Sequence, residues 1–302
     1  MRNSSERSMP ELPEVETVRA GLEQLLRGEL MTDIDVFHPR AIQRSEGDVA
    51  GLAALTGRRV EAVVRRGKFL WFEMEGLALN FHLGMSGQLL VTQAGTPAPA
   101  HRHMRARMTF ENGSVLRFLD QRTFGYLQRS SLTEVRDDHP AGQGTQSRLI
   151  PVPVSHIARD VLDPWVEAGD VAKRTRRKRT EIKRAMLDQT LASGMGNIYC
   201  DEALYRAKIN PRRKTNGLSY QRLEELWQHS RDVLEEALEQ GGTSFDSLYV
   251  NVNGASGYFS RSLQAYGQGG KPCGRCGATM TRIQFMNRSS TFCPLCQPYA
   301  SR

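Results

Sequence analysis

The 302-residue chain has no long apolar run and few aromatic residues. No segment approaches the roughly 18 consecutive apolar residues of a membrane-spanning helix. The first eight residues, Met1 to Ser8, lack the apolar core of a secretory signal. Hydrophobic residues make up 39% of the chain, aromatic residues 7% and charged residues 25%, a globular composition. We therefore expect a cytoplasmic protein with no membrane partner, long enough for two domains.

Cysteine is also scarce, with five residues, too few for a disulfide framework in a chain of this kind. Four of them form the pattern Cys273-x2-Cys276-x16-Cys293-x2-Cys296, and this spacing can supply four thiolates to a tetrahedral zinc ion. Reducible disulfides or chance spacing are the alternatives. We expect one structural zinc, because the last forty residues have no apolar core of their own. Cys200, outside the pattern, is expected to be a small buried residue.

The first half of the chain predicts antiparallel β-structure. Residues 60–130 are rich in β-branched and aromatic side chains, and Met104–Phe110 alternates strictly between apolar and polar. An Asn112-Gly113 turn then predicts a hairpin into Val115–Leu119. One helix is expected near residues 14–26. Residues 136–158 are polar and aperiodic and predict a linker.

The second half predicts helices. Apolar residues recur at helical spacing after Ser219, a possible N-cap, and Gly241-Gly242 ends the run. Upstream, the segment from Leu187 predicts a helix, a Gly194-x-Gly196 turn and a second helix near Asn197. This turn lacks a third glycine and a preceding strand, so no nucleotide cofactor is expected.

Acidic residues are outnumbered: 41 Lys and Arg face 33 Asp and Glu, and the excess is clustered. Residues 173–179 hold six positive charges, and Lys183-Arg184 follow closely. Such a run alone is commonly a solvated surface. Beside a helix N-terminus, and with Arg282 and Arg288 near the cysteines, it favours binding to nucleic-acid phosphates.

Several motifs carry a family resemblance. The segment Met9-Pro-Glu-Leu-Pro-Glu-Val-Glu16 resembles the opening of the formamidopyrimidine-DNA glycosylase family. Further collinear matches are Arg65–Lys68, His82–Gly87, Asp120–Gly125, Gly194–Tyr199, Gly257–Phe259 and the cysteine pattern, so that the resemblance runs from Met9 to about Gln297.

The resemblance implies an α+β multidomain fold. The N-terminal domain would be an antiparallel β-sandwich with flanking helices (residues 9–135), followed by the linker 136–158. A helical helix–two-turns–helix domain (159–265) and a β-hairpin zinc finger (266–302) would complete it, with DNA in the cleft between the domains. Residues 1–8 would be an extension that is disordered or wrongly assigned.

The implied activity is that of a bifunctional DNA glycosylase and abasic-site lyase of base excision repair. Its substrates would be oxidised purines in double-stranded DNA, and it would act as a monomer. The sister branch that removes oxidised pyrimidines, and a catalytically dead protein that binds damaged DNA, are the alternatives. The purine branch is favoured by the arrangement of Arg122 and Phe124.

The resemblance also assigns roles at the start of the chain. Pro10 would attack C1′ of the sugar, because an N-terminal proline is a secondary amine whereas a proline within a chain is an amide. Glu11 would be the general acid that opens the sugar ring. A rigid helix lead-in is the structural alternative for both. In this chain Met9 and eight further residues precede Pro10, so the Pro10 nitrogen is an amide in the 302-residue form. We therefore expect the active protein to begin at Pro10.

Other roles follow from the same match. Lys68 would be a second proton donor near the lesion, although it could instead be an exposed strand lysine. Arg288 would donate a proton or charge in the second (δ) elimination. The remaining positions would contact DNA, through phosphates or by filling the space of the extruded base: His101, Lys178, Asn197, Met85, Arg122 and Phe124. Met85 and Phe124 could instead be core residues, and His101 a solvated histidine. Thr123 replaces the family's usual basic residue.

Overall fold

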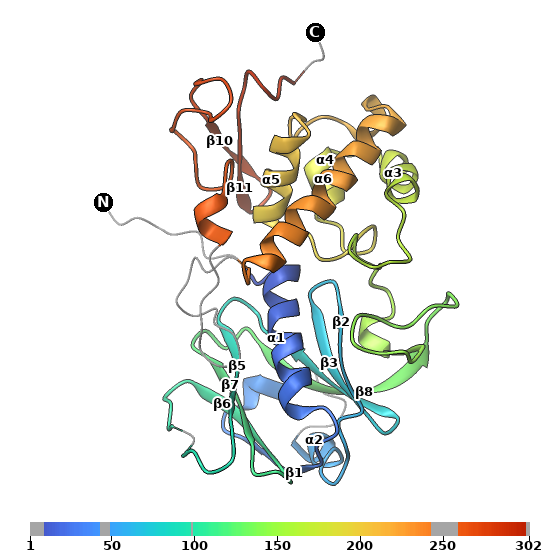
Figure 1. Ribbon diagram of the computed structural model, residues 1–302, viewed down its shortest axis with the longest axis vertical. Helices are drawn as coiled ribbons and strands as arrows, with labels where there is room; N and C mark the ends of the chain where they lie inside the picture. Colours follow the sequence, from blue (N-terminus) through green and yellow to red (C-terminus); the bar gives the residue numbers. More distant parts are fainter. Residues whose placement is uncertain (1–8, 43–48, 98, 243–258, 300–302) are drawn as a thin grey trace. The chain divides into compact units, whose positions relative to one another are not determined.

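The computed structural model describes residues 9–42, 49–97, 99–242 and 259–299. The chain divides into two compact units, residues 1–156 with 241–257, and residues 157–240 with 258–302 (Figure 1). The expected extension 1–8 and Gly257-Tyr258 of the family motif lie outside the described ranges. None of the described helices is long and apolar enough to cross a membrane.

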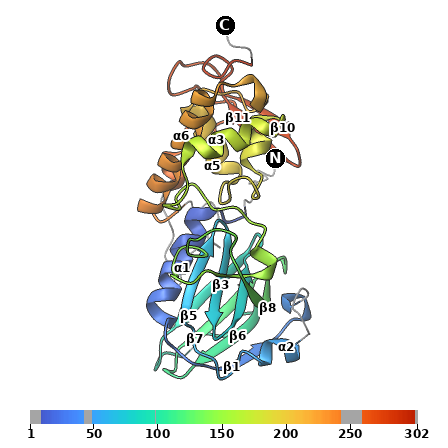
Figure 2. The same cartoon turned by 90° about the vertical axis from the view of Figure 1, so that its right-hand side faces the viewer.

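The first unit is built on two antiparallel sheets (Figure 2). A four-stranded sheet has the order β1-β6-β7-β5, and a five-stranded sheet has the order β2-β3-β4-β8-β9. The strands are β1 (Met31–Val36), β2 (Ala62–Arg66), β3 (Phe69–Met74), β4 (Leu77–His82), β5 (Gly87–Thr92), β6 (Met104–Phe110), β7 (Val115–Asp120), β8 (Tyr126–Glu134) and β9 (Leu149–Pro151). The helical segments are α1 (Leu12–Leu26), η1 (Pro39–Ile42), α2 (Val49–Ala53) and η2 (Val152–Val154). The expected β-sandwich is confirmed.

One apolar core fills this unit. It joins residues of both sheets to α1, for example Phe72, Phe118 and Leu22, all fully buried. Helix α1 contacts β2 and β5, an edge strand of each sheet, and so closes one side of the sandwich. The predicted hairpin is present, since β6 pairs with β7 and Gly113 lies in the turn with φ +79°. The alternating residues Ala106, Met108 and Phe110 are buried as expected.

Most of the expected linker 136–158 belongs to the first unit, whose boundary falls between His156 and Ile157. Residues 141–147, here called the strap, run along the edge strand β2. The Arg65 backbone N–H donates to the Gln143 carbonyl at 3.0 Å, and the Gln143 N–H donates back at 2.9 Å. A Cβ at Gly142 would lie 2.3 Å from the Arg65 carbonyl oxygen. Glycine is what lets this aperiodic segment approach the strand.

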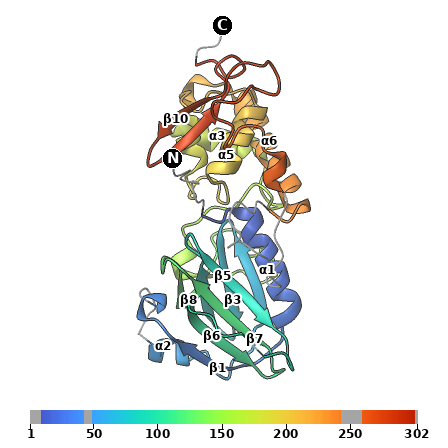
Figure 3. The ribbon, with the colours of Figure 1, turned by 90° about the vertical axis from the view of Figure 1, so that its left-hand side faces the viewer.

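The second unit is helical and carries a hairpin (Figure 3). Its elements are α3 (Ala168–Arg177), α4 (Ile182–Met186), α5 (Asn197–Arg206), η3 (Thr215–Gly217), α6 (Tyr220–Glu239), η4 (Phe259–Ser262), β10 (Thr281–Phe285) and β11 (Arg288–Phe292). Helix α6 packs on α3 and α5, and α5 contacts β11. Ser219 caps α6 by accepting the Arg222 N–H at 3.2 Å, as expected. Cys200 is fully buried, also as expected.

The segment before Gly194 differs from expectation. The sequence predicts a helix from Leu187, but α4 ends at Met186. Residues 187–196 form a loop that side-chain hydrogen bonds stabilise. Gln189 donates to the Leu187 and Met195 carbonyls at 3.0 and 3.1 Å and accepts the Gly194 N–H at 3.0 Å. Asp188 accepts the Thr190 N–H at 2.9 Å. These side-chain bonds compete with helical backbone bonds, which the apolar spacing alone could not reveal.

Candidate functional site

The N-terminal end of α1 carries the first predicted pair. Glu11 is the N-cap, and a capping box joins it to Glu14: the Glu11 N–H donates to Glu14 Oε2 at 2.9 Å, and the Glu11 carboxylate accepts the Glu14 N–H. Glu11 is 1% exposed, and Pro10 is buried beside it. The positive end of the helix dipole stabilises an acid here. The helix start therefore holds the side chain of Glu11, the residue that follows Pro10, in a fixed and buried position.

Lys68 lies in a tight turn, whereas its sequence context predicted a strand. Strand β2 ends at Arg66 and β3 begins at Phe69, so Gly67-Lys68 form a two-residue hairpin loop. Gly67 has φ +58°, which suits glycine at the first central position of such loops. Lys68 is half-buried. A short loop of this kind holds the lysine backbone more firmly than a long loop would.

Two further loops of the first unit bring Met85 and Arg122 together. The Arg122 guanidinium lies 3.7 Å from the Met85 sulfur. Phe124, two residues further, exposes 58% of its surface. The structure thus gathers Met85 and Arg122 at one place and leaves Phe124 exposed, so the core interpretation of Phe124 is wrong.

The buried residue Asp120 binds both of these loops. Its carboxylate is 1% exposed and accepts the Ser86 hydroxyl, the Arg122 N–H at 3.0 Å and the Gly125 N–H at 2.7 Å. The Arg122 N–H also lies 3.1 Å from the Ser86 oxygen. One buried acid therefore sets both the loop after β4 and the loop after β7.

His101 is exposed on the loop before β6, and its ring lies 5.5 Å from that of His103. Within the described ranges, neither histidine belongs to a group of three or more residues able to hold a metal ion. The arrangement leaves His101 available to solvent or to a ligand.

In the second unit, Lys178 caps the C-terminal end of α3 and forms an ion pair with Asp188 at 2.8 Å. Partial burial alone would raise the pKa of Asp188, but hydrogen bonds from Lys178 and Thr190 lower it below its ordinary value. Asp188 is therefore ionised near neutral pH, and its charge holds the Lys178 ammonium in the ion pair.

Asn197 begins α5, behind the N-cap Gly196. It is 4% exposed, and its side-chain oxygen has no hydrogen-bond partner among the described residues. The backbone N–H groups of this first turn lie where a helix attracts anions.

The four predicted zinc ligands come together. The sulfur atoms of Cys273, Cys276, Cys293 and Cys296 lie within 4.8 Å of one another. A zinc tetrahedron with bonds of about 2.3 Å spaces its sulfurs about 3.8 Å apart, so the cluster fits a closed structural site. Burial alone would raise the pKa of Cys273. Hydrogen bonds from the Tyr205 hydroxyl and neighbouring backbone N–H groups outweigh this effect and lower the pKa to about 6, which favours the thiolate ligand.

Arg288 is exposed at the start of β11, directly after the tight turn that joins it to β10. The register pairs it with Phe285. The predicted position of Arg288 on the finger hairpin is therefore observed.

Three family models match the chain in order. They are the formamidopyrimidine-DNA glycosylase N-terminal domain (residues 9–127), the H2TH domain of the same enzymes (157–248) and a zinc finger found in FPG and IleRS (270–298). A formamidopyrimidine-DNA glycosylase of Mycobacterium sp. (strain KMS) is 50% identical over 96% of this chain and 98% of its own. The chain belongs to the formamidopyrimidine-DNA glycosylase family. It contains the family's zinc finger, and the zinc is structural.

Solved structures of the family share the fold of this chain. The MutM (Fpg) protein of Thermus thermophilus matches with a TM-score of 0.78 and 32% identity, over 97% of this chain and 100% of its own. A Lactococcus lactis Fpg variant in complex with Fapy-dG-containing DNA matches with a TM-score of 0.79 and 31% identity, over 96% and 100%.

Sequence reasoning missed two groups in this formamidopyrimidine-DNA glycosylase chain. Asp120 was noted only as part of a motif. The charge pattern predicts Lys183 on the basic surface, but Lys183 is fully buried and pairs with Asp201 at 2.7 Å. Asp201 also accepts the Ser290 hydroxyl at 2.7 Å and the Thr291 N–H at 3.0 Å, which ties α5 to β11 of the finger. The apolar residues Ile182 and Ala185 of this short helix were the available sequence signal that one side of it faces inward, and both are buried.

Proposed function

We propose that this chain is a bifunctional DNA glycosylase and abasic-site lyase of base excision repair that removes oxidised purines. The observation that carries the proposal is the start of α1, where Pro10 is buried and precedes Glu11, the buried N-cap residue of the helix. The matches to named formamidopyrimidine-DNA glycosylases over nearly the whole chain support the same activity.

The chemistry begins at Pro10. Its free amine attacks C1′, the bond from C1′ to the base nitrogen breaks, and the proton that the amine loses on attack goes to the departing base. Glu11 protonates the ring oxygen, so the sugar opens to an iminium joined to the Pro10 nitrogen. This iminium draws electrons from C2′ after loss of a proton there, and the 3′ C–O bond breaks. A second elimination breaks the 5′ C–O bond, and Arg288 supplies positive charge for that step.

Lys68 donates a proton near the lesion. The other positions serve DNA binding: His101, Lys178 and the first turn of α5 at Asn197 contact phosphates. Met85 and Phe124 fill the space of the extruded base, and Arg122 reads the partner base. The exposed ring of Phe124 supports this role, because a core phenylalanine is rarely left in solvent.

The substrate class distinguishes the alternatives. The Lactococcus lactis relative was solved with Fapy-dG-containing DNA, a ring-opened purine lesion, which favours the purine branch. Strand cleavage is measured on duplexes with 8-oxoguanine, with thymine glycol and without damage. Preferential cleavage of 8-oxoguanine supports the proposal, preference for thymine glycol indicates the pyrimidine branch, and binding without cleavage indicates a dead enzyme. We also expect a cytoplasmic location. Sedimentation of the complex tests the further expectation that the protein acts as a monomer.

The nucleophile is tested with two forms of the protein, one beginning at Met1 and one at Pro10, each verified by intact mass. Borohydride reduction on 8-oxoguanine DNA should trap only the form with the free Pro10 amine, because an amide nitrogen cannot form the iminium. Equal trapping of the Met1 form would show that Pro10 is not the nucleophile, and Lys68 would be the next residue to test.

A further inference from the structure

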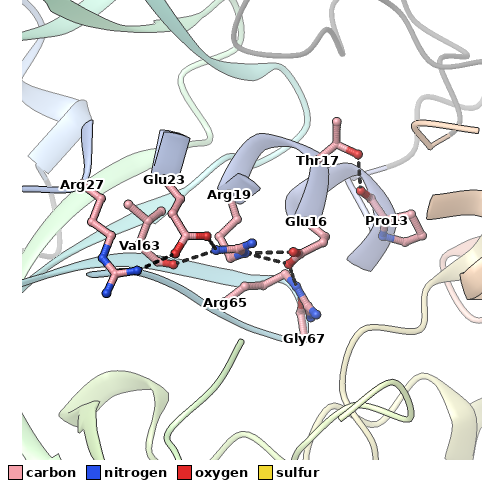
Figure 4. A network of polar contacts seen from close by, with 9 residues as sticks. All are labelled: Pro13, Glu16, Thr17, Arg19, Glu23, Arg27, Val63, Arg65 and Gly67. Atoms are coloured by element: carbon pink, nitrogen blue, oxygen red, sulfur yellow. Dashed lines mark hydrogen bonds and ion pairs between the residues drawn. The ribbon is translucent and has the colours of Figure 1, made fainter. Parts of the chain in front are cut away.

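A network of charged side chains joins α1 to the β2–β3 turn (Figure 4). Glu16, on the second turn of α1, accepts hydrogen bonds from Arg19 Nε at 2.9 and 3.0 Å and from Arg65 Nε at 2.6 Å. Arg19 also contacts Glu23 and donates to the Val63 carbonyl of β2 at 3.2 Å. A single carboxylate of the helix thus contacts guanidinium groups from the helix and from the strand.

Arg65 extends the network to the turn that carries Lys68. Its Nη1 donates to the Gly67 carbonyl at 3.0 Å while its Nε holds Glu16. The planar guanidinium fixes the directions of these two bonds relative to each other, which a lysine ammonium would not do. The Arg65 side chain is 4% exposed and that of Glu16 is 15% exposed, so water does not readily replace either bond.

The strap holds the backbone of the same strand. Both backbone groups of Arg65 pair with Gln143, and a Cβ at Gly144 would lie 2.2 Å from the Val63 carbonyl oxygen and 2.7 Å from Arg19 Nη1. The end of β2 is therefore held both by α1 and by the strap. The turn that follows begins from a strand with little freedom to shift.

We propose that Glu16 and Arg65 are positioning residues that set Lys68 relative to the Pro10–Glu11 end of α1. Glu16 lies five residues beyond Glu11, about 7.5 Å along the helix axis. From Glu16, two hydrogen bonds through Arg65 lead to Gly67, which is bonded to Lys68. The inference rests on the proposed role of Lys68. A misplacement of about 1 Å at a catalytic group can cost roughly 100-fold in rate.

The test compares Arg65→Met and Glu16→Gln with the wild-type protein that begins at Pro10. We expect single-turnover excision of 8-oxoguanine to slow about 10- to 100-fold, while duplex affinity changes less than threefold. Glu23→Gln is the matched control, because Glu23 contacts Arg19 and Arg27 of α1 but not Arg65. It should change the excision rate less than twofold. Glu16→Gln keeps an acceptor for Arg65 at nearly the same size, so it remains informative if Arg65→Met does not fold.

A double-mutant cycle separates the inference from the function it rests on. If Arg65 acts through Lys68, Arg65→Met should slow excision no further once Lys68→Ala is present. Wild-type excision by Lys68→Ala would refute the role of Lys68 itself. Two outcomes would refute the positioning role alone, given that Lys68→Ala is slow. In the first, Arg65→Met and Glu16→Gln excise at the wild-type rate. In the second, the rate losses of Arg65→Met and Lys68→Ala multiply in the double variant.

Discussion

Replacement of Asp120 by alanine should loosen the two loops that carry Met85 and Arg122. The buried carboxylate accepts three hydrogen bonds, from the Ser86 hydroxyl and the Arg122 and Gly125 N–H groups. Without it, Arg122 N–H keeps the Ser86 oxygen as an acceptor at 3.1 Å. Gly125 N–H has no such second acceptor among the bonds described for it, so the main cost falls there.

The magnitude follows from these partners. A hydrogen bond to a charged group contributes about 1.5–3 kcal/mol, and a buried donor left unsatisfied costs about 1–3 kcal/mol. Because Arg122 retains one acceptor, we expect Asp120→Ala to destabilise the first unit by about 3 kcal/mol. For a unit of this size that corresponds to a fall in Tm of roughly 6–12 °C. Asp120→Asn keeps one oxygen but presents an amide where Gly125 N–H needs an acceptor, and should cost about 2 kcal/mol.

The assay is thermal unfolding of each variant together with excision opposite cytosine and opposite adenine. Asp35→Asn is the control, because Asp35 forms a half-exposed ion pair with Arg107 in the same unit. It should cost less than about 1 kcal/mol. Asp120→Ala should also reduce the preference for cytosine, since the Arg122 loop loses its support. A wild-type Tm for Asp120→Ala would refute the assignment of the carboxylate as the acceptor that holds these loops.

Other predictions concern DNA binding and metal. Cys293→Ser should lose its zinc, as measured by metal analysis, and its affinity for duplex DNA should fall at least tenfold while the first unit keeps its melting transition. Wild-type DNA binding by the metal-free protein would contradict this. Lys178→Ala should weaken binding to all duplexes alike. It should also lower by about one the slope of log affinity against log salt concentration, measured by anisotropy titrations. Asp188→Asn should tighten binding severalfold, because Lys178 no longer has a charged competitor for phosphate; unchanged affinity would show that the ion pair does not compete. Arg122→Ala should reduce the excision preference for cytosine over adenine, and an unchanged ratio would exclude base reading by this residue.

The zinc finger and the general architecture could be predicted because their signals are local. Two CxxC pairs bring their sulfurs together through short turns, and a helix cap such as Ser219 acts within one helical turn. The strand order could not be obtained this way. Strand β5 pairs with β7, and β1 pairs with β6 some 70 residues later, with Ile34 opposite Met108. Such pairings depend on how distant apolar faces meet, which alternation in one segment does not encode.

The site shows the same division between local and distant causes. Pro10 and Glu11 were identified from a contiguous motif, and the structure places them at a helix start. Lys183 was misassigned to the basic surface, because its partners Asp201 and Ser289 lie 18 and 106 residues away. The sequence predicts a linker at the strap, because the pairing of the strap with β2 involves backbone groups and glycines, and neither produces an apolar pattern.

Three carboxylates with little exposure to solvent and with distant partners share one function in this fold. Glu16 fixes the approach to the Lys68 turn, Asp120 fixes the Arg122 loop, and Asp201 fixes the strand that begins at Arg288. Each accepts hydrogen bonds from segments that the chain separates widely, so each converts a flexible turn or hairpin into a defined support for a basic residue. Because these acids are largely covered, their charges lie away from the surface that a phosphate backbone would meet. These three acids therefore add little exposed negative charge to a chain in which 41 Lys and Arg outnumber 33 Asp and Glu, a balance that suits a polyanionic substrate.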